Sequence, residues 1–289
     1  MPDNSVLLID TCSDLPADLA ESLDVEIVRF PYSIDGTEYI DDFGRSHGHD
    51  EFYASMRAGT HPTTMQVPRQ AFVDTFRTHA AEGRALLYLA LSSALSGTFD
   101  VAWSARQEVL GEFPEAEIRL VDTKAASIAE GLLVYEAARM WKAGTPLVEI
   151  ERWVGESRPR LNGWFIIDDL DTLVRGGRLP GAVAAAGTLL DVKPLLHISD
   201  DGRLEMTRRF RGRQKSMHAL ANLVGERIDG SPSRRVAIGH GDCANDAALL
   251  RDMVLERTSA DEVLMMQVGP VIGTHTGPGM LAVAFWGEA

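Results

Sequence analysis

The chain has 289 residues, 45% of them hydrophobic, and a formal net charge of -14 at pH 7. This length exceeds that of a usual single domain, so we expect two domains that share a cleft. The strong negative charge, with a pI near 5.0, argues against a protein that coats nucleic acid or an anionic membrane surface.

The sequence predicts neither export nor stable membrane insertion. The apolar run over 6–9 is too short for a signal peptide and is bracketed by aspartates. The segment over 263–287 has no Asp, Glu, Lys or Arg, but its glycines and prolines would break a lone spanning helix. Two cysteines, Cys12 and Cys243, cannot build a disulfide framework. We therefore expect a cytoplasmic protein.

Strand-like and helix-like patterns alternate along the chain, which favours an α/β fold with a largely parallel sheet. Asp35 and Gly36, between short alternating stretches, predict a hairpin. Apolar runs predict strands over 5–9, 25–30, 85–91 and 118–121. Capping residues and helical spacing predict helices that begin near Ser13, at Pro68, and at Ser96 or Thr98, with another over 126–141.

The pattern restarts beyond Gly144 and Pro146, so we place a domain boundary near residue 157, which gives α/β domains over 1–157 and 158–289. In the second domain we expect strands over 164–167, 194–198, 204–208, 236–240, 264–267 and 281–285. Helices are predicted through Leu173, over 180–190, and from about Gln214 and Asn245.

Four hydroxyl side chains lie in the motif SSALSGT at 92–98, directly after the apolar run over 85–91. In open α/β sheets, ligands bind beyond the carboxyl ends of the strands. Ser92, Ser93 and Ser96 can donate to an anionic head group, each bond being worth roughly 1.5–3 kcal/mol. Thr64 can add a further hydroxyl. The alternative is that these hydroxyls only cap the helix that follows.

A second motif, HTGPG at 275–279, places His275 in what we expect to be a loop. The imidazole can serve as a base, as a donor to a bound oxyanion, or as an ordinary loop residue. A Ser-His nucleophile pair is the sharpest alternative function. The G-x-S-x-G motif of serine hydrolases is absent, however, which argues against it.

Two other groups invite a chemical interpretation. His47, His49 and Asp50 resemble metal ligands, but no second ligand cluster lies nearby, and a solvated loop that begins a helix explains them better. Cys12 lacks a Cys-x-x-Cys partner and is better explained as a small residue at a turn. We expect no metal and no cofactor.

Basic residues gather in two places. Five arginines and Lys215 fall within positions 203–215, and RGGR stands at 175–178. A charge run usually forms a solvated face, but guanidinium groups in an acidic chain also suit phosphate or an acidic partner. Because a G-x-x-x-x-G-K-[ST] loop is absent, we do not expect the chain to hydrolyse nucleotide itself.

Motifs along nearly the whole chain carry a family resemblance. They are IDTCSDLP at 9–16, TMQ at 64–66, SSALSGT at 92–98, VDTK at 121–124, GGR at 176–178, VKPL at 192–195 and HTGPG at 275–279. In this order they resemble the DegV family of bacterial fatty-acid-binding proteins, which includes the FakB subunit of fatty acid kinase. The resemblance implies a DegV-like two-domain α/β fold, with a Rossmann-like parallel sheet in the N-terminal domain and a ligand tunnel between the domains.

The resemblance also implies roles. A long-chain fatty acid would lie in the tunnel, its carboxylate held by Thr64, Ser93 and His275 with support from Ser92 and Ser96, and the helix over 180–190 would form a tunnel wall. Arg178 and Arg211 would engage a partner kinase. That ATP-dependent fatty acid kinase would phosphorylate the carboxylate, and the acyl phosphate would pass to an acyltransferase of phospholipid synthesis.

On this view the protein is a non-catalytic subunit that presents its ligand. Two alternatives remain open. One is an esterase or thioesterase that uses Ser96 or Ser93 with His275. The other is a lipid carrier or sensor that serves no kinase.

Overall fold

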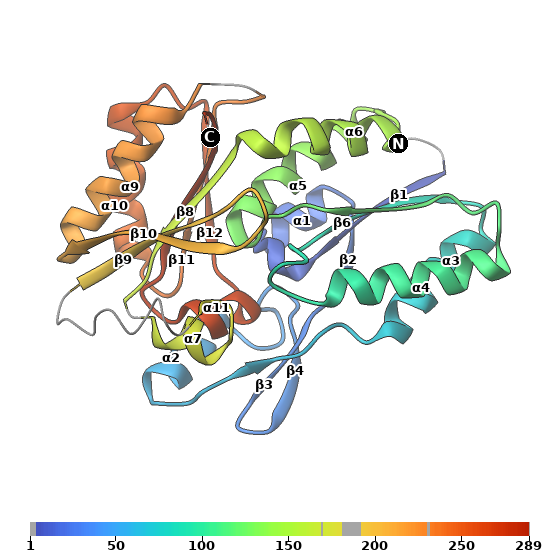
Figure 1. Cartoon of the computed structure of the whole chain (residues 1–289), viewed down its shortest axis with the longest axis horizontal. Helices are drawn as coiled ribbons and strands as arrows, with labels where there is room; N and C mark the ends of the chain where they lie inside the picture. Colours follow the sequence, from blue (N-terminus) through green and yellow to red (C-terminus); the bar gives the residue numbers. More distant parts are fainter. Residues whose placement is uncertain (1–3, 169, 181–191, 230–231, 289) are drawn as a thin grey trace.

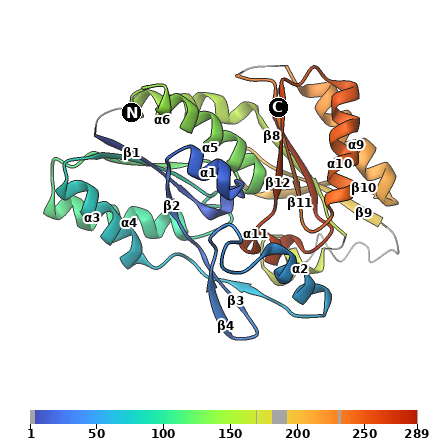
Figure 2. The same ribbon diagram turned by 180° about the vertical axis from the view of Figure 1, so that it is seen from behind.

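The computed structural model describes residues 4–168, 170–180, 192–229 and 232–288 (Figures 1 and 2). The fold is α/β, as predicted, and its two larger sheets lie on either side of helix α5 (Ser127–Lys142) (Figure 1). The helix expected over 180–190, and its expected role as a tunnel wall, fall outside the described residues except for Pro180.

The first sheet is parallel throughout, as the sequence predicts. Its strands, in sheet order, are β2 (Glu26–Val28), β1 (Ser5–Asp10), β6 (Ala85–Ala90) and β7 (Ile118–Asp122). Strands β1 and β6 are covered on both faces, which explains their nearly uninterrupted apolar runs.

Successive side chains of β1 point into different cores because the side-chain period of a strand is two. Val6 and Leu8 pack with α3 (Arg69–Ala81) and α4 (Thr98–Glu112). Leu7 and Ile9 pack with α5 and α6 (Leu147–Ser157). Helix α6 was not predicted; it begins directly after Pro146, where the sequence pattern restarts.

The second sheet has six strands and is mostly antiparallel. In sheet order they are β10 (Leu204–Arg211), β9 (Val192–Ile198), β8 (Leu161–Ile166), β13 (Leu281–Trp286), β11 (Arg235–His240) and β12 (Glu262–Gln267). Only the β11–β12 pair is parallel. The expectation of a largely parallel sheet therefore holds for the first sheet alone. In the second sheet, a short connection such as the β9–β10 turn can join only antiparallel neighbours, because parallel strands need a longer crossover.

Helices cover both faces of the second sheet. Helices α9 (Arg213–Arg227) and α10 (Ala244–Arg257) form a core with one face. Helix α5 contacts β8, β11 and β13 on the other face and β1 of the first sheet as well. A single core cluster consequently joins both halves of the chain. The predicted domain boundary at residue 157 coincides with the end of α6 and stays a prediction.

A small third sheet carries one of the candidate site residues. Strands β3 (Pro31–Ile34) and β4 (Thr37–Ile40) form the predicted hairpin, and β5 (Thr63–Thr64) pairs with β3. Asp35 and Gly36 both have positive φ, at 49° and 82°, which is the geometry of a tight two-residue hairpin turn. Helix α2 (His49–Arg57) follows β4, so His49 begins a helix as expected.

His275 lies on a helix, and the prediction of a loop was wrong. Helix α11 (Pro270–Thr276) begins with a proline, whose missing N–H costs nothing in a first turn. Gly273 lets the helix pack closely on the rings of Phe52 and Tyr53. Gly277, with φ of 75°, ends it. The same glycines and prolines that indicated a loop therefore start, seat and end a short helix.

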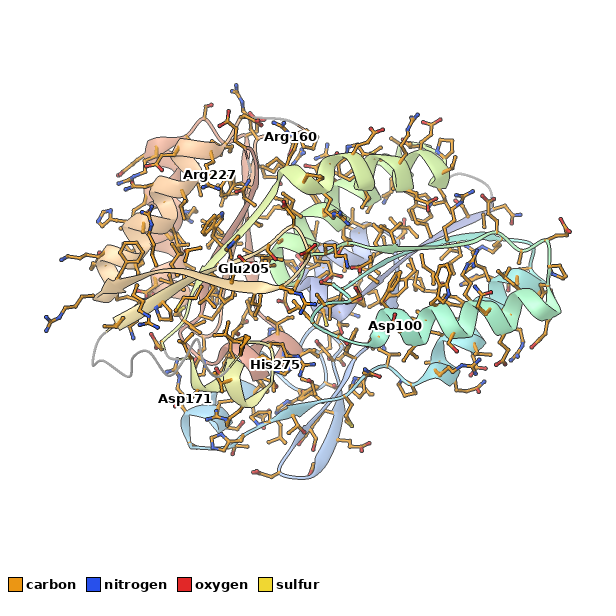
Figure 3. The ribbon with its side chains drawn as sticks, in the orientation of Figure 1. Asp100, Arg160, Asp171, Glu205, Arg227 and His275 are labelled. Carbon is orange, nitrogen blue, oxygen red and sulfur yellow. The ribbon has the colours of Figure 1, made fainter. Side chains whose placement is uncertain are left out.

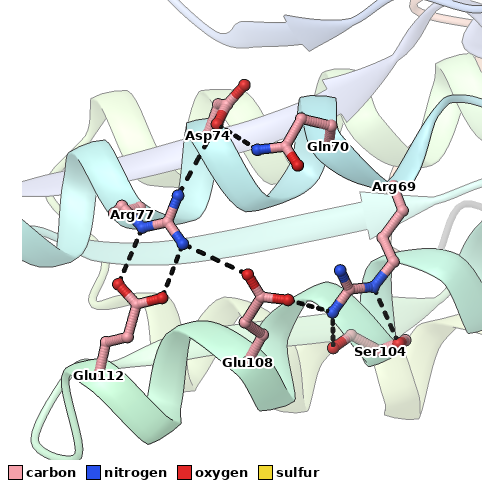
Figure 4. Close-up of polar contacts among 7 residues, drawn as sticks. All are labelled: Arg69, Gln70, Asp74, Arg77, Ser104, Glu108 and Glu112. Atoms are coloured by element: carbon pink, nitrogen blue, oxygen red, sulfur yellow. Dashed lines mark hydrogen bonds and ion pairs between the residues drawn. The ribbon is translucent and has the colours of Figure 1, made fainter.

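Helices α3 and α4 are held together at their surface by ion pairs (Figure 4). Arg77 contacts Glu112 at 2.6 Å and Glu108 at 3.3 Å, and Arg69 contacts Glu108 at 2.5 Å. Because these side chains are exposed to solvent, water screens the pairs and they contribute little to stability. Among the described residues, none of the helices is long and apolar enough to span a membrane.

Candidate functional site

An apolar cavity lies between the carboxyl end of β6 and the second sheet; together with the solvent open to it, its empty space is about 760 Å³. The start of α5, strands β8 and β13 and helix α11 contribute to its wall. Its apolar side chains include Phe30, Leu95, Trp164, Ile198, Leu204 and Ile272. A cavity with this apolar lining suits the hydrocarbon part of a ligand. We call it the apolar cavity.

Two polar side chains meet at one end of the apolar cavity. Oγ1 of Thr64, on β5, lies 2.9 Å from Nε2 of His275, on α11. Both residues line the cavity. Figure 3 shows His275 next to helix α7 (Asp171–Arg175), on which Asp171 is labelled. The structure thus brings two of the predicted head-group residues into contact, and their role in holding a carboxylate stays a prediction.

The imidazole of His275 is neutral at physiological pH. Burial, and then the nearby positive charge of Arg178, lower its pKa from 6.5 to about 4. Its Nδ1 is buried and has no hydrogen-bond partner among the described residues. One nitrogen is therefore engaged by Thr64, while the other is buried without a hydrogen-bond partner among the described residues.

The first glycine of the GGR motif makes room for this ring. A Cβ atom at Gly176 would overlap with Nδ1 of His275 and lie 2.9 Å from its Cε1. The backbone of α7's last turn thus lies directly against the imidazole. Sequence analysis missed this role, because only the fold brings residues 176 and 275 together.

Arg178 places a positive charge beside the Thr64–His275 pair. Its guanidinium donates to the carbonyl oxygens of Leu95 at 3.0 Å and Gly176 at 2.5 Å. The group is half-buried and its pKa is lowered by burial. Carbonyl oxygens do not neutralise a cation, so the guanidinium retains the capacity to attract an anion.

A second cavity of about 700 Å³, the outer cavity, lies on the other side of this pair. Thr64, Arg178 and His275 line both cavities. The rest of the outer cavity includes polar residues such as His61, Thr172 and Arg175. The three shared residues therefore stand at the boundary between an apolar interior and a polar depression.

The three serines of the SSALSGT motif have different surroundings. Ser96 lines the apolar cavity, and its Oγ lies 3.0 Å from Oγ1 of Thr98 and accepts from the Thr98 amide at 3.3 Å. It thus reaches the cavity and also supports the start of α4, so the cap and ligand interpretations are compatible.

Ser92 and Ser93 do not line the apolar cavity in the part of the chain that the structure describes. Ser92 is fully buried, and its Oγ donates to the carbonyl oxygen of Gly202 at 2.9 Å. Ser93 accepts a hydrogen bond from Nζ of Lys124 at 3.0 Å. Their assignment to a ligand head group stays a prediction.

The Ser-His geometry of a hydrolase is not formed by these residues. Within the described chain, His275 bonds to Thr64, and none of Ser92, Ser93 and Ser96 is bonded to it. A serine nucleophile needs its base within hydrogen-bond reach. The esterase interpretation therefore lacks its geometric basis here.

Arg211, the other predicted docking residue, is exposed at the end of β10 and lines neither cavity. Cys12 is fully buried, and burial raises the pKa of its thiol well above the usual range, so it is not a reactive nucleophile. No group of His, Cys, Asp and Glu able to hold a metal ion occurs among the described residues.

Behind the site lies a carboxyl group that the sequence pattern did not reveal. Asp14 accepts from the Gly269 amide at 2.8 Å, and Ser127 donates to it at 2.5 Å. Burial raises its pKa to about 8. Asp14 thereby joins the residue before α11 to the first residue of α5, both of which carry cavity residues.

Comparisons with known proteins agree with this architecture. A family model described as an uncharacterised protein of the DegV family matches residues 5–288. A DegV domain-containing protein of Clostridium perfringens is 41% identical over 283 residues, covering 98% of this chain and 97% of the relative. Further DegV domain-containing relatives occur in Streptococcus pyogenes, at 38% identity over 282 residues.

Solved structures of similar fold are described as fatty-acid-binding proteins. One from Thermus thermophilus has a TM-score of 0.83 and 32% identity, covering 98% of this chain and 99% of that chain. One from Thermotoga maritima has a TM-score of 0.84 and 26% identity, covering 98% and 99%. The resemblance inferred from the motifs is confirmed: the chain belongs to the DegV family.

Proposed function

We propose that the protein binds one long-chain fatty acid, with its tail in the apolar cavity and its carboxylate at the Thr64–His275 pair. The observation that carries the proposal is the position of this pair, between the apolar cavity and the outer cavity. Similar structures from Thermus thermophilus and Thermotoga maritima, described as fatty-acid-binding, support it.

The energetics fit this orientation. Each buried methylene contributes about 0.8 kcal/mol, so the tail supplies most of the affinity. A carboxylate next to an apolar interior requires donors and a compensating charge. Thr64 and Ser96 offer hydroxyls, and Arg178 offers the charge. Ser92 and Ser93 belong to the proposed head-group site through the family resemblance, and Ser93 requires its Lys124 contact to rearrange.

The bound carboxylate would face the outer cavity and a partner protein. We place there an ATP-dependent fatty acid kinase, to which this chain presents its ligand as a non-catalytic subunit. Arg178 and the exposed Arg211 would dock this kinase. The acyl phosphate would then pass to an acyltransferase of phospholipid synthesis. This role belongs in the cytoplasm and needs neither a cofactor nor stable membrane insertion.

The binding step is tested by mass spectrometry of lipid extracted from protein purified from bacteria, followed by titration of delipidated protein with fatty acid. One fatty acid per chain is the expected result. Trp164 lines the cavity, so its fluorescence should change on binding and a Trp164→Phe variant should lose that signal. Protein that carries no lipid and takes up none would refute the carrier proposal.

The kinase step needs a separate test with a purified fatty acid kinase and ATP. Arg211→Ala should keep its fatty-acid affinity while acyl phosphate formation falls severalfold; Arg152→Ala, an exposed arginine on α6, is the matched control. Tight lipid binding without phosphorylation by any kinase tried would favour a carrier or sensor. Hydrolysis of a chromogenic ester, abolished by Ser96→Ala, would favour the esterase.

A further inference from the structure

A third cavity adjoins the apolar cavity at the end away from His275. This distal cavity has a volume of about 540 Å³. Ala129, Gly163 and Ile198 line both it and the apolar cavity. It shares no described residue with the outer cavity. The apolar cavity therefore lies between two polar depressions, one at each end.

The partition between the apolar and distal cavities is thin. A Cβ atom at Gly163 would lie 3.0 Å from Cβ of Ala129 and 3.4 Å from Cδ1 of Ile198. Only a methyl group, a glycine and the flexible end of an isoleucine thus meet at this place. A rotamer change of Ile198 alone can alter the separation, because its Cδ1 is at the end of a rotatable side chain.

Three charged side chains, Lys124, Arg158 and Asp200, line the distal cavity. Lys124 is already paired with Asp122 at 2.7 Å. Asp200, on the β9–β10 turn, is exposed. Arg158, in the 3-10 turn η2 (Arg158–Arg160), is only partly exposed, and its side chain makes no hydrogen bond or ion pair with another described residue. Arg158 is consequently the cation of this cavity whose charge is not balanced by a partner.

The position of Arg158 fits the far end of an extended ligand. Arg158 lines the distal cavity, and Figure 3 labels Arg160, the last residue of the same turn, away from His275 in this view. Ser92 holds the β9–β10 turn in place through the carbonyl oxygen of Gly202. Ser199 and Asp200 of that turn line the distal cavity. The SSALSGT motif thus shapes both ends of the apolar cavity.

We infer that the distal cavity accepts a polar, anionic ω-terminus, so that the protein also binds α,ω-dicarboxylic fatty acids. The inference rests on the proposed function. In a closed apolar cavity the second carboxylate would be buried without a partner, which is strongly unfavourable. Here it reaches the guanidinium of Arg158, which can bind a carboxylate in bidentate fashion.

The test compares each dicarboxylic acid with the monocarboxylic acid of the same chain length, across a series of lengths, by calorimetric titration of delipidated protein. We expect at least one diacid to bind wild type as tightly as its monoacid. Arg158→Ala should lower the affinity for that diacid about tenfold or more and leave the affinity for the monoacid unchanged. Arg158→Lys should restore part of the affinity. Arg152→Ala, on the exposed side of α6, is the matched control.

The outcomes separate this inference from the proposed function. Monoacids that bind while every diacid fails would overturn the inference alone, as would a diacid affinity that Arg158→Ala does not change. Failure of both ligand types would overturn the proposed function and the inference with it. Because the side chain of Arg158 makes no hydrogen bond or ion pair with another described residue, its variants should retain the melting temperature of wild type.

Discussion

Oγ1 of Thr64 and Nε2 of His275 lie 2.9 Å apart although 211 positions separate them in the chain. Strand β5 and helix α11 bring them together at the end of the apolar cavity. The position of the pair depends on the small third sheet, on the backbone of Gly176 directly after α7, and on the hydrogen bond by which Asp14 anchors the start of α11. Each of these supports can be tested separately.

Removing either member of the pair should weaken fatty-acid binding. Thr64→Val and His275→Ala should each raise the Kd about tenfold, because a hydrogen bond to a charged head group is lost. Calorimetric titration measures the change. Thr37→Val, at an exposed threonine of β4 that lines none of the three cavities, is the matched control. Unchanged affinity in both variants would refute the head-group assignment.

Gly176→Ala should displace the imidazole. The new methyl group would overlap with Nδ1 of His275, and the backbone that carries it cannot move as easily as a side chain. Fatty-acid affinity should fall about as much as in His275→Ala. Gly155→Ala, at a helical glycine with open space around it, should bind normally. Wild-type affinity in Gly176→Ala would show that the ring position is not critical.

Ser92→Ala should destabilise the protein more than Ser93→Ala does. Ser92 is buried, and its loss leaves the Gly202 carbonyl without this donor, at a cost of about 1–3 kcal/mol. Ser93 is only partly buried, and Lys124 keeps its pairing with Asp122. Urea unfolding gives both free energies. Equal stability of the two variants would contradict an anchoring role for Ser92.

Asp14→Asn should remove a pH-dependent loss of stability. The folded pKa of Asp14 is about 8 against the usual 3.8, so between these values unfolding releases a proton. In this interval the free energy of unfolding of wild type should therefore fall, relative to that of the variant, by about 1.4 kcal/mol for each unit by which the pH rises. An asparagine can accept from Gly269 and donate to Ser127 in place of the acid.

Urea unfolding at a series of pH values checks this prediction. The exposed Asp18→Asn serves as the control and should show no such trend. If the free energies of unfolding of wild type and Asp14→Asn differed by the same amount from acidic to alkaline pH, the prediction would be contradicted.

The contribution of His275 to stability changes with pH in the opposite direction to that of Asp14. Its folded pKa of about 4 lies below the usual 6.5, so protonation favours the unfolded chain. Its contribution to stability is complete above pH 6.5 and is lost as the pH falls through 4. An NMR titration of the imidazole should show a midpoint near pH 4. A midpoint near 6.5 would mean that the ring is exposed to solvent.

The sequence determined much of the fold because local patterns carry it. The uninterrupted apolar runs of β1 and β6 identified a buried parallel sheet, and Asp35-Gly36 identified a hairpin. The motifs identified the family, and with it Thr64 and His275 as partners. These signals depend on neighbouring residues or on a fixed motif, so they are visible without coordinates.

Only the tertiary structure decided how the site is built. The glycines and prolines around His275 fit a loop or a short helix equally well, and packing against Phe52 and Tyr53 selects the helix. Ser92 and Ser96 belong to one motif, yet one holds the β9–β10 turn and the other lines the cavity. Gly176, Asp14 and Arg158 owe their roles to residues distant in the chain. Contacts of this kind depend on how the elements pack, which no local pattern encodes.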